Sequence, residues 1–254
     1  MNAYALAAVI FVCGYLANVT MISVFYHRAL AHRAVRLRPV GRFIVAHLGM
    51  WVTGLDPKGW VCMHRMHHLH SDTPDDPHSP QNVGIIGVAL AQLRSYEKVL
   101  KGLHNGREPY TSLVRDLDIP TSWAMRYGLW FAPYLLHLGV ATGLAWLTAS
   151  WLVGLAYFAG LMSHPVQGWM VNGFGHAVGY RNYPLDDSSR NNTLVAWLVF
   201  GEGYQNNHHR YPASAQFAHR WFEVDFGFVA CVLLAAFGIV SINVAGAPRA
   251  AEVP

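Results

Sequence analysis

The chain has 254 residues and a net charge of +4, and only 13% of its residues are charged, whereas about 25% are charged in a typical soluble domain. Because 53% of the residues are hydrophobic, the composition indicates a membrane protein and excludes a disordered chain. Three cysteines, Cys13, Cys62 and Cys231, lie far apart in the sequence, which argues against a disulfide framework and a cysteine zinc site.

The first predicted element is a membrane-spanning helix over residues 4–26. Residues 1–26 contain no Asp, Glu, Lys, Arg or His, and an uncharged run of this length crosses a bilayer. Five arginines follow between Arg28 and Arg42, and basic residues beside a span mark the cytoplasmic side. We therefore expect the N-terminus outside and His27 at the cytoplasmic face.

Two other interpretations of this region are not favoured. The start has no basic segment or cleavage site typical of a signal peptide. The arginines lie beside a membrane span, which argues against nucleic-acid binding.

Three more apolar stretches follow along the chain. Residues 43–55 are too short to span and predict an interfacial or half-buried helix. Residues 127–180 contain no Asp, Glu, Lys or Arg, and 54 residues at about 1.5 Å each suffice for two spans, expected at 128–149 and 152–174. The polar residues Thr148 to Ser150 mark the turn between them. A last uncharged stretch could span over 226–246 or lie as a helix on the cytoplasmic part, and hydropathy leaves both open.

The sequence predicts one membrane domain over residues 1–254, because no linker rich in Ser, Gly or Pro divides it. We expect an all-α fold with three to four transmembrane helices. The two hydrophilic blocks, residues 56–126 and 181–225, then lie on the cytoplasmic side and form a helical cap. The domain is thus predicted to be an integral membrane protein that contacts the lipid bilayer and no nucleic acid.

Histidine is the unusual component of this sequence. Fifteen histidines outnumber the fourteen Asp and Glu residues together, which suggests a metal site or a proton path. Many of them fall in four clusters that the predicted topology places on the cytoplasmic side. The clusters are His27 with His32, His64 with His67 and His68, Asn172 with His176, and Gln205 with His208 and His209.

Helix geometry indicates what these spacings can do. At about 100° per residue, His64 and His68 lie about 40° apart on one face, and His67 is rotated about 60° to the other side of His64. A single turn can therefore serve two neighbouring metals. His27 and His32 lie about 140° apart on an ideal helix, so the span should end or distort between them. Eight imidazoles and two amides are too many for a tetrahedral zinc site, and ligation rich in nitrogen suits iron, copper or zinc.

Other histidines are predicted to have no part in a metal site. A single histidine at a membrane interface is usually a polar anchor, and this interpretation applies to His47, His104, His137, His164 and His219. The loop 71–81 contains Asp75, Asp76 and His78 and could supply a metal ligand, but we favour the interpretation that it is a solvated acidic loop.

The sequence resembles the integral-membrane fatty-acid desaturases, and within them the stearoyl-CoA (Δ9) branch. The resemblance covers the chain from His27 to about Phe228. It rests on His27 to His32, Trp60 four residues before His64, His64 to His68, Asp76 to His78, Trp169 to Asn172, His176, Gly179 to Arg181, Asn191-Asn192, Gly201 to Tyr204, and Asn206 to His209.

The resemblance implies an oxygen-dependent fatty-acyl desaturase with two Fe ions in a non-haem di-iron centre. Family members take two electrons from outside and leave a cis double bond in an acyl chain. A cytochrome b5 haem motif is absent, which implies an external electron-transfer protein. The acyl carrier, whether CoA, carrier protein or lipid, stays open. By position, one iron would be held by His27, His32, His64, His68 and His209, and the second by His67, His176 and His208, with Asn172 acting through a water.

Two departures from the Δ9 branch concern the metal site and the topology. Gln205 stands where that branch usually has a histidine, so it is a tentative ligand. There is room for one span before the first histidine cluster, where the branch usually has two.

Two alternative functions stay open. One is a membrane hydroxylase or monooxygenase on the same di-iron scaffold, and the other is a membrane metal-binding or transport protein. Glu202, Asp76 and Asp186 are the acidic residues expected to orient metal-bound histidines.

Overall fold

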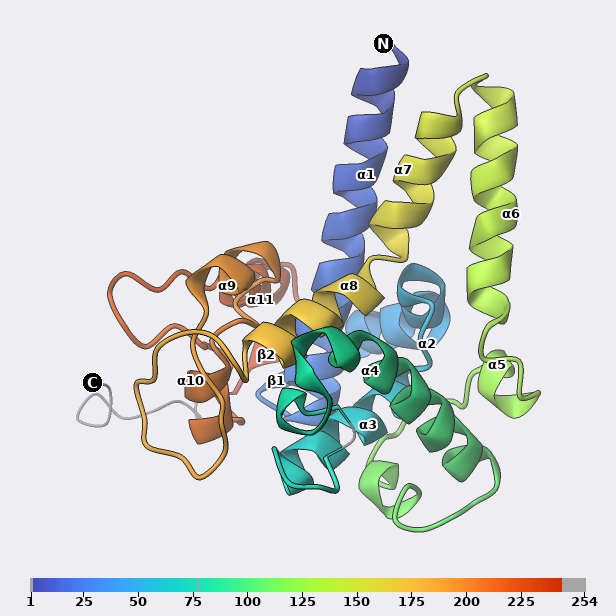
Figure 1. Ribbon diagram of the computed structural model, residues 1–254. Coiled ribbons are helices and arrows are strands. Elements are labelled where there is room, and N and C mark those ends of the chain that lie inside the picture. The colour runs from blue at the N-terminus through green and yellow to red at the C-terminus, as the bar shows by residue number, and fades with distance from the viewer. Residues whose placement is uncertain (1, 77, 244–254) are drawn as a thin grey trace.

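The computed structural model describes residues 2–76 and 78–243 (Figure 1). The α-helices are α1 (Ala3–Thr20), α2 (Pro39–Thr53), α3 (Pro57–His70), α4 (Pro80–His104), α5 (Trp123–Arg126), α6 (Ala132–Leu147), α7 (Trp151–Leu161), α8 (His164–Trp169), α9 (Thr193–Leu198), α10 (Gln205–Arg210) and α11 (Phe226–Ala236). Two π-helices, η1 (Met21–Ala31) and η3 (Met170–Phe174), and the short 3₁₀ helix η2 (Ser112–Val114) complete the helical part.

The prediction of a helical protein is confirmed, although a small sheet was not predicted. Strands β1 (Val35–Leu37) and β2 (Val240–Ile242) pair antiparallel, with Val35 opposite Ile242. This pairing fastens the segment after the first long helix to the segment after α11. Residues 1, 77 and 244–254, which include the end of the predicted segment 226–246, lie outside the described residues.

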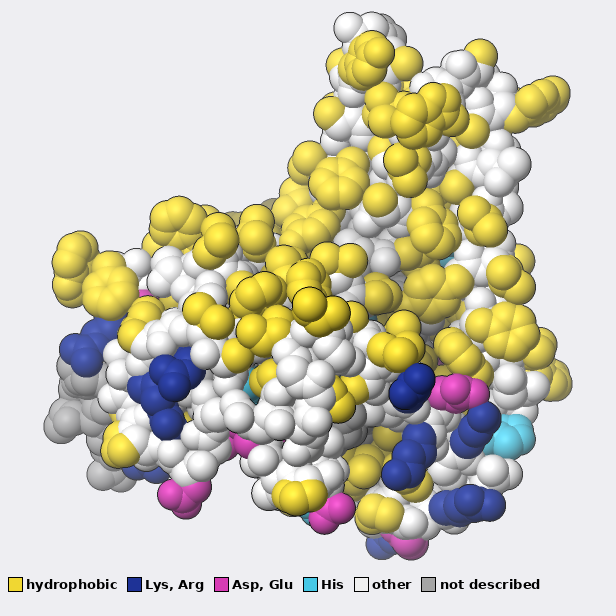
Figure 2. Space-filling view, in the orientation of Figure 1, with side chains coloured by type: hydrophobic (Ala, Val, Ile, Leu, Met, Phe, Trp, Pro, Cys, Tyr) yellow, Lys and Arg dark blue, Asp and Glu magenta, His cyan; other side chains and the backbone are white. Residues whose placement is uncertain are grey.

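Helices α1 and η1 form one continuous helix over 29 residues, Ala3–Ala31, and of the described helices it is the one long and apolar enough to cross a membrane. Figure 1 shows α1, α6 and α7 standing together and extending away from the rest of the molecule. Helix α7 packs against both α1 and α6. Hydrophobic side chains cover much of this projection in Figure 2.

The predicted hairpin turn is confirmed, since α6 ends at Leu147 and α7 begins at Trp151. The predicted helix over 152–174 is wrong as one continuous element, because α7 ends at Leu161 and α8 begins at His164. Pro165 explains the interruption: proline lacks the backbone N–H that would bond to the carbonyl oxygen of Leu161, and its ring disfavours a helix that continues through that carbonyl.

The predicted helix over 226–246 is also shorter than expected. Helix α11 ends at Ala236, and Gly238 adopts a left-handed backbone with a φ of 69° before the chain enters β2. Such a conformation costs little at glycine and commonly ends helices. The predicted helix at 43–55 corresponds to α2, which ends at Gly54 in the same conformation, with a φ of 74°.

The core of the molecule surrounds η1, in which all 11 residues are buried. Side chains of η1, such as Val24 and Phe25, join a hydrophobic cluster with Val61 and Cys62 of α3 and Val99 of α4. The histidines carried by η1 and α3 are therefore held by two well-packed elements. This packing positions the site described next.

Candidate metal centre

Five histidines converge at the end of the long first helix. One nitrogen of each of His27, His32, His64, His68 and His208 lies within 4.8 Å of all the others. The Nε2 atoms of His27 and His208 are 3.0 Å apart, those of His32 and His64 are 2.7 Å apart, and those of His68 and His208 are 3.0 Å apart. Imidazole nitrogens bind metals such as zinc at about 2.0–2.1 Å, so several ligands of one ion lie this close together. The residues therefore fit one metal ion.

The π-helix explains how His27 and His32 reach the same ion. The backbone N–H of His32 donates to the carbonyl oxygen of His27 at 3.1 Å, a bond that spans five residues. In a π-helix, residues five apart lie about one turn apart and therefore on nearly the same face. On an α-helix, the same two residues would lie about 140° apart around the axis. The distortion expected between the two histidines is thus present.

A second group is formed by His67, His176 and His209, whose ligand nitrogens also lie within 4.8 Å of one another. Their Nε2 atoms are buried and have no hydrogen-bond partner among the described residues. Such a set of convergent, unpartnered nitrogens is what a metal ion requires. His64 and His68 belong to the first group and His67 to the second, which is the separation expected from helix geometry.

In each histidine of the second group, the other ring nitrogen, Nδ1, is within hydrogen-bond distance of a carboxylate. Nδ1 of His67 lies 2.9 Å from Asp76, Nδ1 of His176 lies 2.9 Å from Asp72, and Nδ1 of His209 lies 2.8 Å from Asp187, measured in each case to Oδ2. A carboxylate that accepts the Nδ1 proton fixes the tautomer with a free Nε2 lone pair. The second group is therefore oriented for metal binding.

The protonation states agree with this arrangement. Burial alone would raise the pKa of Asp76, but the hydrogen bond from the His67 ring and the electrostatic attraction between the two groups lower it to about 2. The pKa values of Asp72 and Asp187 are lowered in the same way by their histidines. Burial and the neighbouring histidines depress the pKa of His68 well below its ordinary value. At neutral pH the carboxylates are therefore charged and His68 presents a neutral imidazole.

The predicted assignment of His208 and His209 to the two metal ions is wrong. His208 lies with the first group and His209 with the second, the reverse of the expected assignment. Asp187 holds His209 in the second group by the hydrogen bond to its Nδ1. His208 packs against Phe217, with ring centroids 4.6 Å apart, and this contact directs it to the first group.

A buried ion network supports His27. Its Nδ1 lies 2.5 Å from Oε2 of Glu202, and Oε1 of Glu202 accepts a hydrogen bond from the Arg28 guanidinium at 2.7 Å. Arg28 is fully buried and also donates to both carboxylate oxygens of Asp225, at 3.0 and 3.1 Å. The network fixes the carboxylate that orients the His27 ring.

The loop 71–81 differs from the predicted solvated loop. Asp75 is exposed, but Asp76 and His78 are buried, and together with His67 they form a third cluster with ligand atoms within 4.8 Å. Asp76 also accepts hydrogen bonds from the backbone N–H groups of Asp72 and His78, which hold its carboxylate in place beside His67.

The sequence predicted two of the orienting carboxylates, Glu202 and Asp76, and missed two. Asp186 is exposed, and its neighbour Asp187 contacts the histidine instead. Asp72 lies 104 residues before His176 in the chain, so only the fold brings them together. No spacing in the sequence could have indicated that contact.

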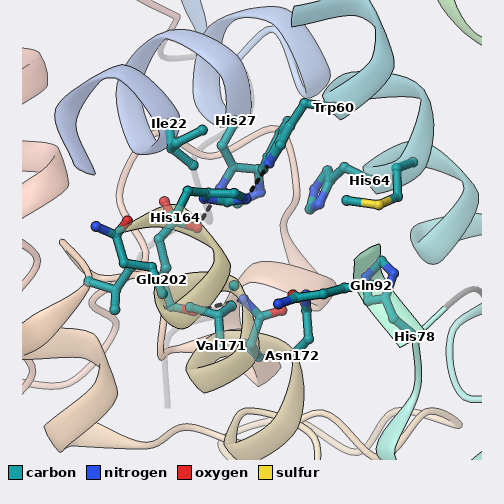
Figure 3. A pocket seen from close by; sticks show the side chains of 15 residues that line it. Ile22, His27, Trp60, His64, His78, Gln92, His164, Val171, Asn172 and Glu202 are labelled. Atoms are coloured by element: carbon teal, nitrogen blue, oxygen red, sulfur yellow. Dashed lines mark hydrogen bonds and ion pairs between the residues drawn. The ribbon is translucent and has the colours of Figure 1, made fainter. Parts of the chain in front are cut away.

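The two amides lie beside the histidines in a pocket shown in Figure 3. Asn172 is labelled there near His27, His64 and Glu202. Gln205 also lines this pocket. Gln205 is buried, and its side-chain N–H donates to the backbone oxygen of Glu202 at 2.7 Å. The metal-ligand roles of both amides stay predictions.

The five histidines that were predicted to be polar anchors at the membrane interface have different surroundings in the structure. His47 and His104 are exposed, and His219 is buried beside the Tyr183 hydroxyl. His137 is fully buried, with Nδ1 2.8 Å from the Tyr157 hydroxyl and Nε2 2.8 Å from the Trp51 carbonyl oxygen, so both nitrogens have partners within the protein. His164 lines the pocket beside the metal centre, and the anchor interpretation is wrong for it.

Comparison with known proteins agrees with the histidine pattern. The fatty acid desaturase family model matches residues 2–228. An sn-2 palmitoyl-lipid 9-desaturase of Nostoc is 28% identical over 89% of this chain and 77% of its own length. A hex-5-enoyl-[acyl-carrier protein] acetylenase of Moorena producens is 32% identical over 86% of this chain and 71% of its own length. An sn-1 stearoyl-lipid 9-desaturase of Anabaena variabilis is 44% identical, but over only 29% of this chain and 27% of its own length.

Proposed function

The chain belongs to the fatty acid desaturase family, and we propose that it is an oxygen-dependent fatty-acyl desaturase that inserts a cis double bond at a histidine-ligated di-iron centre. The observation that carries this proposal is the pair of histidine groups that share one turn of α3. Its relatives include 9-desaturases of acyl lipids. An acyl chain carried by a lipid is therefore the first substrate to test.

The residues present fit two irons. We assign His27, His32, His64, His68 and His208 to one ion, and His67, His176 and His209 to the other. Asn172, through a water, and Gln205 are the proposed additional ligands of the second ion. When bound, the irons supply the dioxygen activation that removal of hydrogen from an unactivated methylene needs.

The remaining residues orient the ligands and exclude water. Asp72, Asp76, Asp187 and Glu202 hold the Nδ1 side of four histidines, which keeps the Nε2 lone pairs directed at the metals. The burial of these rings keeps bulk water away from the reacting carbons. The two electrons that the reaction consumes come from a separate electron-transfer protein in this proposal.

We place α1, α6 and α7 in the lipid bilayer, as parts of a single membrane domain. Large apolar side chains on these helices are exposed, among them Val9, Leu135, Leu138, Trp146 and Leu155. The body that carries the histidines then lies on the cytoplasmic side, because the basic segment from Arg33 to Arg42 follows the first span directly. Both histidine groups lie at that end of the span, whereas a metal transporter places its ligands near the membrane midplane.

Lipid analysis of cells that express the chain tests the proposed reaction. We expect an unsaturated acyl chain that cells with an empty vector lack, and we expect it to disappear with His67→Ala. A matched control is His47→Ala, because His47 is exposed and lies outside both groups. A hydroxylated product in place of the double bond would instead establish the hydroxylase alternative.

A further inference from the structure

The two hairpin helices are too short to cross a bilayer by themselves. Helix α6 has 16 residues and α7 has 11, so they are about 24 and 17 Å long at about 1.5 Å per residue. The hydrocarbon layer of a bilayer is about 30 Å thick, and any tilt of a helix shortens the depth that it covers. With α1, α6 and α7 in the bilayer, as proposed above, the hydrocarbon layer therefore extends past the hairpin and reaches the body that carries the histidines.

The long first helix gives a scale of depth for this layer. Ala7 of α1 packs in one cluster with Val153 of α7, so the start of α1 lies level with the hairpin turn. Tyr4, Trp146 and Trp151 are exposed near this level. Because exposed Tyr and Trp side chains are typical of a membrane–water interface, we place the outer boundary of the layer there.

The other boundary lies where the buried charges begin. A layer of about 30 Å covers about 20 residues of a helix, so a layer that begins at Tyr4 ends close to Ser23. The Ser23 hydroxyl donates to Glu202 at 2.6 Å, and Glu202 also bonds to Arg28. Charged groups are costly inside hydrocarbon, so the position of this network agrees with a boundary at Ser23. His27 follows Ser23 by four residues, and the first histidine group thus begins about one helical turn beyond the layer.

Helix α9 lies within this range of depth. The Tyr15 hydroxyl donates to the carbonyl oxygen of Leu198, the last residue of α9, at 2.6 Å. Tyr15 is eleven residues beyond Tyr4, which places this contact about 17 Å into the layer. Leu194, Trp197 and Leu198 are the exposed residues of α9. Their spacing of three and four residues puts them on one face of the helix.

Helix α11 continues the same surface. Its first residue, Phe226, contacts Phe200 just after α9, with ring centroids 6.4 Å apart. Phe226, Val229 and Leu233 are exposed on one face of α11, and Cys231 is buried on the opposite face. Neither α9 nor α11 contains Asp, Glu, Lys or Arg. Figure 2 shows hydrophobic side chains along the upper surface of the body, beside the projecting helices.

We propose that α9 and α11 form a docking face that lies in the cytoplasmic leaflet of the bilayer and contacts lipid acyl chains. The occupant is lipid, because the contact between Tyr15 and Leu198 lies inside the hydrocarbon layer and every exposed residue of the two helices is apolar. A contact with a cytoplasmic protein would carry polar groups and a polar rim. The inference goes beyond the proposed reaction and rests on the proposed placement of α1, α6 and α7.

Spin labelling of the full chain in lipid vesicles tests the docking face. Cys13→Ser removes the exposed thiol, whereas Cys62 and Cys231 are buried, and this chain without a further cysteine sets the baseline. A nitroxide is attached at Leu194→Cys or at Val229→Cys in vesicles of phosphatidylcholine and phosphatidylglycerol. Its collision rates are measured with molecular oxygen, which concentrates in hydrocarbon, and with a water-soluble nickel chelate.

Two further positions calibrate the measurement. Leu138→Cys puts the label on the exposed surface of α6, and Asp118→Cys replaces a charged side chain that is 94% exposed. We expect the ratio of oxygen to chelate collisions at Leu194 and Val229 to match the ratio at Leu138 and to exceed the ratio at Asp118. A ratio as low as that at Asp118 would overturn the inference. Protection from both reagents would also overturn it, because it would show that a partner protein or a second copy covers the face.

These outcomes are distinct from those of the proposed reaction. Absence of unsaturated product in the lipid analysis would contradict the desaturase assignment, while oxygen-accessible labels at Leu194 and Val229 would still support the docking face. A label at Leu138 that collides mainly with the chelate would contradict the placement of α6 in the bilayer, and the inference would fall with it. Trp197→Cys reports on the same face if Leu194→Cys does not fold.

Discussion

Replacement of Arg28 by Met should strongly destabilise the protein. The guanidinium is fully buried, bonds to Glu202 at 2.7 Å and to Asp225 at 3.0 Å, and lies 3.8 Å from the ring centroid of Phe217. Its removal leaves two buried carboxylates without their cation, and loss of one partner of a buried pair costs about 3–5 kcal/mol. For a chain of this size that corresponds to a fall in unfolding temperature of about 6–20 °C.

The assay is thermal unfolding in detergent, with Arg33→Met as the matched control. Arg33 also pairs with a carboxylate, that of Asp116, but its side chain is 67% exposed, so its loss should cost no more than about 1 kcal/mol. Combining Arg28→Met with Glu202→Gln and Asp225→Asn should recover part of the stability, because the uncompensated charges are removed. Equal unfolding temperatures for Arg28→Met and Arg33→Met would refute the reasoning.

Three further predictions concern the metals and pH. Asp187→Asn should weaken metal binding by His209 about 10- to 100-fold, and the exposed Asp186→Asn should not, as metal titrations of the two variants will show. Gln205→His should retain two irons per chain and Gln205→Leu should lose iron or activity, and equal iron and turnover in both variants would remove Gln205 from the ligands. The metal-free protein should lose stability in unfolding measurements as pH falls below about 6.5, because burial depresses the pKa of folded His68 and its neighbours while the unfolded histidines take up protons. A free energy of unfolding that stays the same between pH 7 and pH 5 would contradict this prediction.

Regular helix geometry made part of the site predictable. The spacing of His64, His67 and His68 fixes their directions on α3, and the structure separates them into two groups as expected. The spacing of His27 and His32 required a distortion, which the π-helix supplies. The hairpin turn at residues 148–150 was predictable because polar residues interrupt a long apolar run.

Contacts between distant segments were not predictable from the sequence. Helix α10 has only six residues between irregular segments, so the directions of His208 and His209 depend on Phe217 and Asp187 rather than on spacing. The pairing of Asp72 with His176 arises from the fold in the same way. The break before α8 did have a signal, Pro165, which hydropathy does not register.

The iron content of a preparation that forms unsaturated product tests the central claim most directly. The two histidine groups predict two irons per chain, one held with His68 and one held with His67. One iron or none per chain in an active preparation would contradict the di-iron centre.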